Sequence, residues 1–262
     1  MGDLGQPDLA PGSDEDLSYL AGDWRIFQPR RGHRWSLDDL VTAWVAAEQV
    51  TSVHPLRFVD LGCGLGSVLM LMAWAFPDAS LWGLEAQSAR ASRARRSLRY
   101  NGASDRCTVV DGDLRDVGAT LVPTLGAAPG VVTGTPPYFD PTATKRASDD
   151  ETAGCRVEIR GGLEVYLDAA NQILAPDGVV VLCYPASEGA RAQSAAEARR
   201  LSLRERLTVV PRDAKPALIV VDVFRRVHGP VAHRTLTVRT LNGAWTEEFR
   251  AVRRRFGMPD GT

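Results

Sequence analysis

The sequence predicts an α/β fold with a seven-stranded, mostly parallel sheet that helices cover on both faces. Two observations favour this fold class. Short apolar segments alternate with helical segments along most of the 262 residues, the order expected of parallel strands joined by helices. Residues 179–182 and 218–221 are apolar throughout, as strands buried on both faces are. The chain has no internal repeat, and its length suits one domain.

The elements follow in order from the N-terminus. Residues 1–16 are rich in Pro, Gly and Asp without periodicity, which predicts a flexible tail. Apolar residues then recur at helical spacing, which predicts a helix over 36–50 with Ser36 as its N-cap. The sheet strands are predicted over 57–61, 80–85, 107–111, 130–134, 179–183, 207–211 and 217–223, with an extra strand over 235–239. Further helices are predicted over 66–76, 86–100, 163–174, 190–201 and 246–256.

Composition excludes several classes of protein. Hydrophobic residues make up 44% of the chain and charged residues 24%, and no apolar run approaches the length of about 18 residues that a membrane span needs. The first residues are neither basic nor apolar, so we expect no secretory signal, no membrane attachment and a cytoplasmic location. The four cysteines have no zinc-site spacing and the four histidines are scattered, so we expect no metal. Cys63, Cys107 and Cys183 lie in apolar segments and are expected to be buried thiols. A monomer is favoured.

Charge is unevenly distributed along the chain. Residues 188–262 hold 15 Arg or Lys and eight Asp or Glu, and all but two of the 31 basic residues of the chain are arginines. Arginine suits phosphate, which permits a nucleic-acid partner, although a GC-rich genome would also produce this bias. In the helix predicted over 86–100, arginines recur every three residues at Arg90, Arg93, Arg96 and Arg99, and their simplest interpretation is a solvated face.

A glycine-rich turn follows the strand predicted over 57–61. Gly62, Gly64 and Gly66 have the spacing G-x-G-x-G, whereas a dinucleotide-binding turn has G-x-G-x-x-G. Glycines in a strand-to-helix turn let a ligand approach the backbone closely. Asp60 beside them suits a ligand ammonium group better than a pyrophosphate. The alternative is a tight turn that needs glycine for its shape alone.

Two more acids follow the next strands. Glu85 ends the strand predicted over 80–85, where a carboxylate can accept both hydroxyls of a ribose. Asp113 follows the strand predicted over 107–111, where it can accept an adenine amine while Leu114 packs against the ring. The alternatives are a helix cap for Glu85 and a turn aspartate for Asp113.

The three acids are thus expected to bind an ammonium group, a ribose and an adenine. S-adenosylmethionine carries all three of these groups. The sequence resembles class I S-adenosylmethionine-dependent methyltransferases, most strongly over residues 57–140. This resemblance implies a Rossmann-like sheet, S-adenosyl-L-methionine as cofactor, and transfer of its methyl group to a positioned nucleophile. It also implies a catalytic domain over 57–262, preceded by a cofactor-capping helical segment over 17–56.

A fourth motif, Thr135-Pro136-Pro137-Tyr138, follows the strand predicted over 130–134. It resembles the N-P-P-Y signature of methyltransferases that act on planar amines. In those enzymes the Asn and a Pro carbonyl accept the amine hydrogens, and the Tyr stacks on the planar group. Alignment and electrostatics then supply most of the catalysis. Thr135 departs from the signature, because a hydroxyl is shorter than the Asn side chain and also donates.

The outer segments resemble bacterial tRNA adenine-N6 methyltransferases that modify the base beside the anticodon of a valine tRNA. These segments are 28–44, 155–162 and 236–249. In that family the first segment closes over the cofactor, which implies cofactor contacts for Arg34 and Ser36. We therefore predict N-methylation of an RNA base, most simply adenine N6 in tRNA. The alternatives are methylation of a small molecule or protein, and a non-catalytic cofactor-binding partner of an enzyme complex.

Arginines around the predicted site are placed to meet phosphates. They are Arg30, Arg31, Arg34, Arg146, Arg156 and Arg160. Tyr138 and Phe139 could stack on a flipped base, and so could Trp35, for which a role in the core is the stronger prediction.

Overall fold

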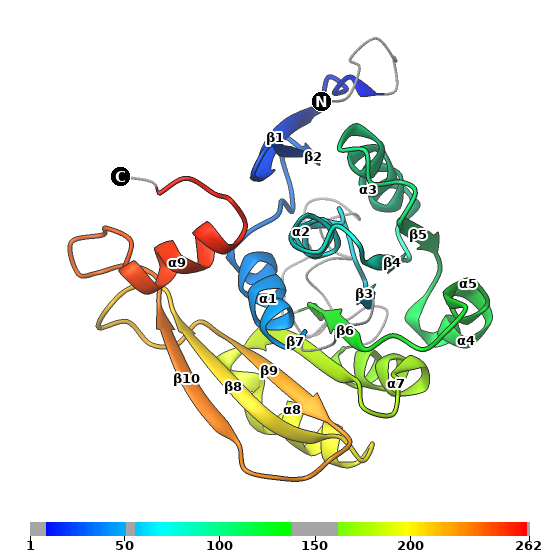
Figure 1. Ribbon diagram of the computed structural model, residues 1–262. Coiled ribbons are helices and arrows are strands. Elements are labelled where there is room, and N and C mark those ends of the chain that lie inside the picture. Colours follow the sequence, from blue (N-terminus) through cyan, green and yellow to red (C-terminus); the bar gives the residue numbers. More distant parts are fainter. Residues whose placement is uncertain (1–8, 51–55, 138–161, 261–262) are drawn as a thin grey trace.

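The computed structural model describes residues 9–50, 56–137 and 162–260, and Figure 1 shows how their elements are arranged. One large mixed sheet crosses the molecule, and a separate two-stranded sheet stands beside it. The large sheet has the strand order β10-β8-β9-β7-β6-β3-β4-β5.

Strands and helices alternate in the described parts of residues 57–210, as predicted, and the last two strands then follow without a helix between them. The strands are β1 (Glu15–Ala21), β2 (Trp24–Pro29), β3 (Arg57–Leu61), β4 (Ser80–Glu85), β5 (Cys107–Asp111), β6 (Val131–Gly134), β7 (Val179–Pro185), β8 (Ser202–Val210), β9 (Ile219–Arg225) and β10 (Ala232–Thr237). The helices are α1 (Leu37–Glu48), α2 (Ser67–Ala75), α3 (Ser88–Tyr100), α4 (Val117–Thr120), α5 (Val122–Leu125), α7 (Leu163–Ile173), α8 (Gly189–Glu197) and α9 (Glu247–Arg255). Short 3-10 turns lie at Leu114–Asp116 and Ala186–Glu188.

The predicted α/β class and the mostly parallel sheet are confirmed, but the count of seven strands is wrong. The sheet has eight, because β10 pairs in parallel with β8 and extends its edge. Only β9 runs antiparallel to its neighbours, β7 and β8. The carboxyl ends of β3, β4, β5 and β6 therefore lie at one edge of the sheet, where ligands bind in open α/β folds.

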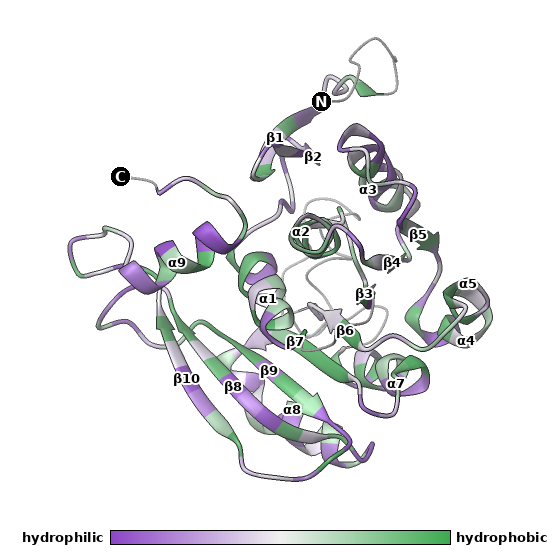
Figure 2. Cartoon of the chain, viewed as in Figure 1, coloured by the Kyte–Doolittle hydropathy of each residue, from purple (hydrophilic) through white to green (hydrophobic). Residues whose placement is uncertain are grey.

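Two apolar layers hold helices against the two faces of the sheet. Alternate residues of a strand enter different layers: Phe58 joins the layer beneath α1, α2, α3 and α9, whereas Val59 joins the layer beneath α4, α7 and α8. This alternation follows from the period of two in a β-strand. Figure 2 shows hydrophobic strands such as β7 at the centre of the molecule, whereas α9 at the periphery carries many hydrophilic residues. No helix in the described parts of the chain is long and apolar enough to cross a membrane.

The β1–β2 hairpin is a feature that the sequence pattern did not predict. Regular structure begins at Glu15, inside the segment expected to be a tail, and residues 17–29 form strands where a helical segment was expected. The hairpin packs against α3: the backbone N–H of Phe27 donates to Ser97 (2.9 Å), and Asn101 bonds both the N–H and the carbonyl of Arg25. The proposed division at residues 16 and 56 stays a prediction.

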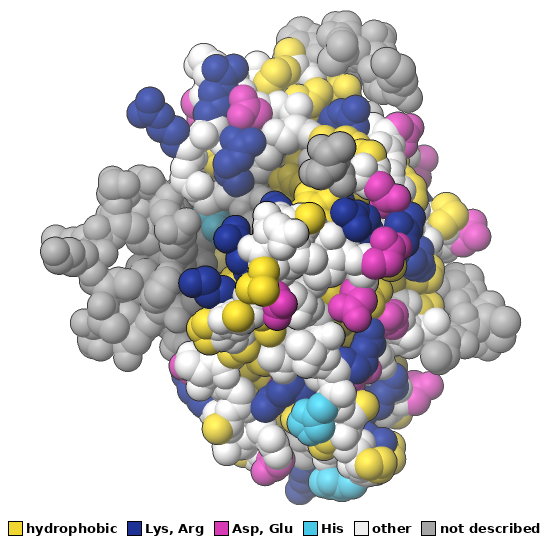
Figure 3. Space-filling model, turned by 90° about the vertical axis from the view of Figure 1, so that its left-hand side faces the viewer, with side chains coloured by type: hydrophobic (Ala, Val, Ile, Leu, Met, Phe, Trp, Pro, Cys, Tyr) yellow, Lys and Arg dark blue, Asp and Glu magenta, His cyan; other side chains and the backbone are white. Residues whose placement is uncertain are grey.

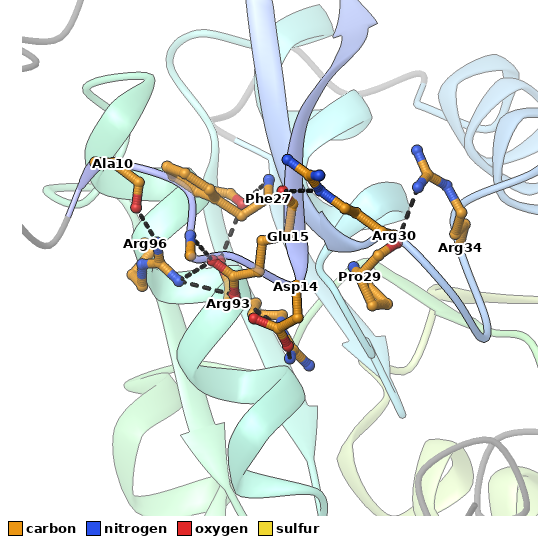
Figure 4. Close-up of polar contacts among 11 residues, drawn as sticks. Ala10, Asp14, Glu15, Phe27, Pro29, Arg30, Arg34, Arg93 and Arg96 are labelled. Atoms are coloured by element: carbon orange, nitrogen blue, oxygen red, sulfur yellow. Dashed lines mark hydrogen bonds and ion pairs between the residues drawn. The ribbon is translucent and has the colours of Figure 1, made fainter.

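A buried carboxylate fastens the hairpin to α3. Glu15 is 5% exposed, and it accepts hydrogen bonds from Arg93 (2.9 Å) and Arg96 (2.8 Å), with Gly12 N–H as a third donor (Figure 4). Burial alone would raise the pKa of Glu15, but these bonds outweigh it and hold the pKa below its usual value. The prediction of a solvated arginine face is therefore wrong for Arg93 and Arg96, and also for Arg90, which is 5% exposed.

We predict that Glu15→Ala destabilises the fold by about 2 kcal/mol, because it leaves Arg93 and Arg96 partly buried without their carboxylate. Urea denaturation followed by circular dichroism measures this as a lower midpoint. The matched control is Asp14→Ala, since Asp14 is 74% exposed and pairs with Arg93 at 3.6 Å. We expect the control to change stability by less than about 0.5 kcal/mol. Equal effects of the two variants would contradict the role given to Glu15.

Candidate active site

A pocket opens at the edge where β3, β4, β5 and β6 end. Its volume is about 850 Å³ when the open space at its mouth is counted. Of the residues predicted from sequence, those that line it are Gly62, Gly64, Glu85, Asp113, Leu114, Thr135 and Pro137. The fold thus brings four separate sequence motifs to one cavity.

The turn after β3 explains its glycines through backbone geometry. Gly62, Gly64 and Gly66 have φ of +62°, +56° and +81°, which side chains disfavour. A methyl group on Gly62 would also overlap the hydroxyl of Tyr166, and one on Gly64 would lie 2.7 Å from Arg90 Nη2. Gly66 is the N-cap of α2 and lies outside the lining. The turn therefore presents bare backbone to the pocket.

Glu85 closes the turn from the end of β4. Its Oε2 accepts from the Gly64 N–H (2.8 Å) and its Oε1 accepts from the Gln87 N–H (2.7 Å). The side chain is only 6% exposed, and it borders the pocket. Each carboxylate oxygen has a further lone pair, so Glu85 can hold the turn and still accept from a ligand.

Asp60 lies behind the turn rather than in the lining of the pocket. It is 3% exposed and sits opposite Thr133 of β6, whose hydroxyl donates to Asp60 Oδ1 (2.7 Å). Burial raises the pKa of Asp60 to about 7, although the Thr133 hydrogen bond acts in the opposite direction. Its predicted contact with a ligand ammonium stays a prediction, and the pocket wall itself carries a different carboxylate.

That carboxylate is Asp39, which sequence reasoning missed. It lies in the first turn of α1, where it accepts from the Ser36 N–H (2.8 Å) in a capping box, and it borders the pocket beside Ser67. Burial, and then the charge of Asp38, raises the pKa of Asp39 to about 8. Its signal was present in the S-x-x-D pattern of residues 36–39, which predicts a capping box but not a pocket position.

Asp113 and Leu114 follow β5 at the far end of the pocket. Asp113 accepts from the Arg115 side chain at 2.8 Å and 2.7 Å and from the Arg115 backbone N–H (3.0 Å). Because Arg115 is exposed, its side chain can move when another donor reaches Asp113. The arrangement can hold a planar ring with an exocyclic amine against Leu114.

Thr135 and Pro137 face the pocket where β6 ends, whereas Pro136 is buried outside the lining. Tyr138, the last residue of this motif, lies outside the described residues, as do Phe139, Cys155, Arg146, Arg156 and Arg160. The structure therefore places the beginning of the motif at the site.

The segment before α1 lies beside the pocket, but Arg30 and Arg34 bind groups of the hairpin instead. Arg34 donates to Asp16 (2.8 Å) and to the Pro29 carbonyl (2.9 Å), and Arg30 pairs with Asp16 (3.2 Å), as Figure 4 shows in part. Neither arginine lines the pocket, nor does Ser36. Trp35 does, and it also packs against the core, which agrees with the core role preferred for it.

Other lining residues were not predicted to be site residues. Tyr166 of α7 is 6% exposed and packs against Gly134 as well as Gly62, while His33 and Arg90 complete the wall. Such positions depend on contacts across the fold. No group of His, Cys, Asp or Glu within the described ranges could hold a metal ion. Cys63, Cys107 and Cys183 are buried free thiols, as predicted.

Known proteins similar to this chain are methyltransferases by name. A tRNA1(Val) (adenine(37)-N6)-methyltransferase of Porphyromonas gingivalis is 28% identical over 147 residues, which are 56% of each chain. The protein of that name from Yersinia pestis is 22% identical over 213 residues, 80% of this chain and 81% of that one. The chain thus spans little more than half the length of the first of these relatives. No family model matches the sequence.

A solved structure with a similar fold is that of a predicted O-methyltransferase from Agrobacterium tumefaciens. Its TM-score is 0.62 with 19% identity, and the match covers 83% of this chain and 97% of that one. This likeness shows the fold: the chain has the Rossmann-like architecture of methyltransferases.

We predict that Gly62→Ala both destabilises the protein and damages the pocket, because the new methyl group overlaps the Tyr166 hydroxyl at a positive φ. The matched control is Gly102→Ala, where φ is +67° but no atom lies within 4 Å of the added methyl. We expect the control to lose about 1 kcal/mol and Gly62→Ala clearly more, as measured by thermal denaturation. Adding Tyr166→Phe to Gly62→Ala should recover part of the loss, and failure to do so would contradict this packing.

Proposed function

We propose that this chain is an S-adenosylmethionine-dependent N-methyltransferase that acts on an RNA base, adenine N6 in tRNA. The observation that carries the proposal is that one pocket contains three features predicted from separate parts of the sequence. These are the glycine turn, the acceptors Glu85 and Asp113, and the pair Thr135 and Pro137. The names of the similar tRNA methyltransferases support the substrate class.

The pocket fits the cofactor by the chemistry of its walls. Glu85 has lone pairs for ribose hydroxyls, and Asp113 with Leu114 suits the adenine edge and face. Asp39 offers a carboxylate within the lining to a positively charged ligand, and Asp60 adds a second carboxyl group beneath the turn. When bound, the cofactor supplies a methyl group on a positively charged sulfonium.

The residues after β6 position the acceptor. Thr135 borders the pocket and can accept one amine hydrogen through its hydroxyl, while the Pro136 carbonyl is the second acceptor in our proposal. These two bonds would direct the nitrogen lone pair at the methyl group. Catalysis then depends on alignment rather than on a strong base. Tyr138 is proposed to stack on the acceptor base.

The occurrence of Thr at position 135 keeps a second candidate open. The hydroxyl reaches less far than an Asn amide, so the acceptor could be a small molecule or a protein side chain. A non-catalytic cofactor-binding role has less support, because Thr135 and Pro137 of the acceptor motif border the same pocket as the glycine turn and Glu85.

The decisive experiment incubates the purified protein with isotopically labelled S-adenosylmethionine and bulk tRNA, followed by mass spectrometry of the nucleosides. We expect labelled N6-methyladenosine. Thr135→Val should lower turnover much more than cofactor affinity, because the lost bond is made to the reacting group. Thr135→Asn should keep or raise activity and serves as the matched control. No tRNA product in any variant, together with measurable cofactor binding, would favour the second candidate.

We predict that cofactor binding at pH 7 releases protons. Burial raises the pKa of Asp39 to about 8 and that of Asp60 to about 7, so both carboxyls are substantially protonated in the free protein at this pH. A cationic ligand favours their ionised forms and lowers both pKa values, which expels protons. Calorimetry in two buffers of different ionisation enthalpy measures the number released.

The variant for this test is Asp39→Asn, which keeps the size of the side chain but cannot ionise. We expect it to bind more weakly and to release fewer protons than the native protein. Native binding should also tighten from pH 6 to pH 7.5, and more steeply than binding by Asp39→Asn. Equal proton release by the two proteins would show that Asp39 does not sense the ligand charge.

A further inference from the structure

We propose that the loops following β8 and β10 form a binding surface for the phosphodiester backbone of the RNA. This proposal rests on the RNA substrate proposed above and names the part of the chain that would hold it. The basic loop surface comprises Arg212 and Lys215 after β8, and Arg239 after β10, together with the apolar Leu218 and Leu241.

The cations of this surface lack the carboxylate partners that many other arginines of the molecule have. Elsewhere arginines are commonly neutralised by carboxylates, as in the pairs Arg199–Asp168 (2.7 Å) and Arg234–Glu48 (2.7 Å). Arg212 and Lys215 are exposed, and neither they nor Arg239 forms an ion pair with any carboxylate in the described ranges. Unneutralised guanidinium and ammonium groups are the usual partners of phosphate.

Tertiary contacts gather these cations around one short turn. Arg239 Nη1 donates to the Gly243 carbonyl (2.6 Å), and Arg212 Nη2 lies 3.9 Å from where a Cβ of Gly243 would be. The backbone N–H of Asp213 donates to the Arg239 carbonyl (2.8 Å), which ties the two loops together. The sequence separates Arg212 from Arg239 by 27 positions, yet the fold places both at the same turn.

An aromatic ring holds part of this cluster in place. The Trp245 ring lies against the guanidinium carbons of Arg239 (5.8 Å) and Arg253 (4.0 Å), which is cation–π geometry. Arg239 is thus pre-organised, and fewer of its side-chain rotations are lost when it binds an anion. Asp213 is the acidic residue within the loop, and its Oδ1 accepts from the Ala214 N–H. The basic groups still outnumber it.

Apolar side chains are exposed on the same surface. Leu218 is 53% exposed and Leu241 is 64% exposed, and they are two of the four exposed large hydrophobic residues in the described ranges. Figure 3 shows the side of the molecule that carries α9, where dark blue basic side chains lie among yellow hydrophobic and magenta acidic ones. Nucleic acid offers phosphates to the cations and sugar or base faces to apolar side chains.

The strand order connects this surface to the pocket. β8 and β10 run parallel to β6 and β7, so their carboxyl ends belong to the same sheet edge as Thr135. Along that edge the backbone N–H of Ala186, after β7, donates to the Leu218 carbonyl (3.2 Å). Three strand spacings of about 4.8 Å separate β6 from β8. A folded RNA with its target base in the pocket can therefore reach the surface along this twisted edge.

The test compares steady-state methylation of tRNA by the native protein, Arg212→Gln and Lys215→Gln over a range of salt concentrations. Loss of one phosphate contact should raise KM for tRNA several-fold at about 0.1 M salt. It should also reduce the slope of log KM against log salt by roughly one per contact. Turnover at saturating tRNA and cofactor affinity measured by calorimetry should stay unchanged, because neither residue lines the pocket.

The matched control is Arg200→Gln, because Arg200 is exposed just before β8, at the opposite edge of the sheet. If Arg200→Gln has the same KM for tRNA and the same salt slope as the native protein, the surface is local. An increase in KM as large as that of the two test variants would indicate only a general charge effect and overturn the proposal. If the native protein methylates tRNA and the two test variants match it, the surface is wrong and the proposed function stands. If the native protein neither binds nor methylates RNA, the substrate proposal fails and this surface fails with it.

Discussion

The turn after β3 is the constraint on which the site depends. Three glycines with positive φ reverse the chain between β3 and α2, and the buried Glu85 carboxylate holds the middle of the turn through the Gly64 N–H. Tyr166 closes in from α7 and occupies the space that a side chain at Gly62 would need. Any larger residue would therefore disturb both the backbone and the opposite wall. The ends of β3, β4 and β6 and the beginning of α7 therefore all meet at this turn.

Several carboxyl groups lie around this turn, and two of them, Asp39 and Asp60, lose favourable solvation because they are shielded from water. Burial raises the pKa of Asp60 to about 7 and of Asp39 to about 8, so the free protein holds protons that a cationic ligand would displace. The Thr133 hydroxyl compensates part of the desolvation of Asp60. Elsewhere the fold pairs buried acids with arginines, as in Glu15 with Arg93 and Asp222 with Arg206. For Asp39 and Asp60 we expect a positively charged ligand to be the partner instead.

The candidate site could be predicted in part because its motifs are local. Gly62, Gly64, Glu85, Asp113 and Thr135 each follow a strand, and parallel strands bring their carboxyl ends together. Asp39 and Tyr166 could not be recognised in this way, since each enters the pocket from a helix whose packing the sequence pattern does not specify. Arg34 shows the converse: its place in a familial segment suggested the cofactor, but Asp16 and the Pro29 carbonyl bind it on the hairpin side.

The sequence by itself determined the α/β class and most element positions, with β4 and β5 matching their predicted bounds. These features depend on apolar period and turn residues, which are local properties of the chain. Only the tertiary structure decided that β8 begins at Ser202, because its charged residues are stabilised across the sheet, Arg206 by Asp222 and Glu205 by Arg234. The same holds for the hairpin on α3. From sequence alone a charged side chain is predicted to be exposed to solvent. Its burial can be recognised only when its partner, which is distant in the sequence, is brought next to it by the fold.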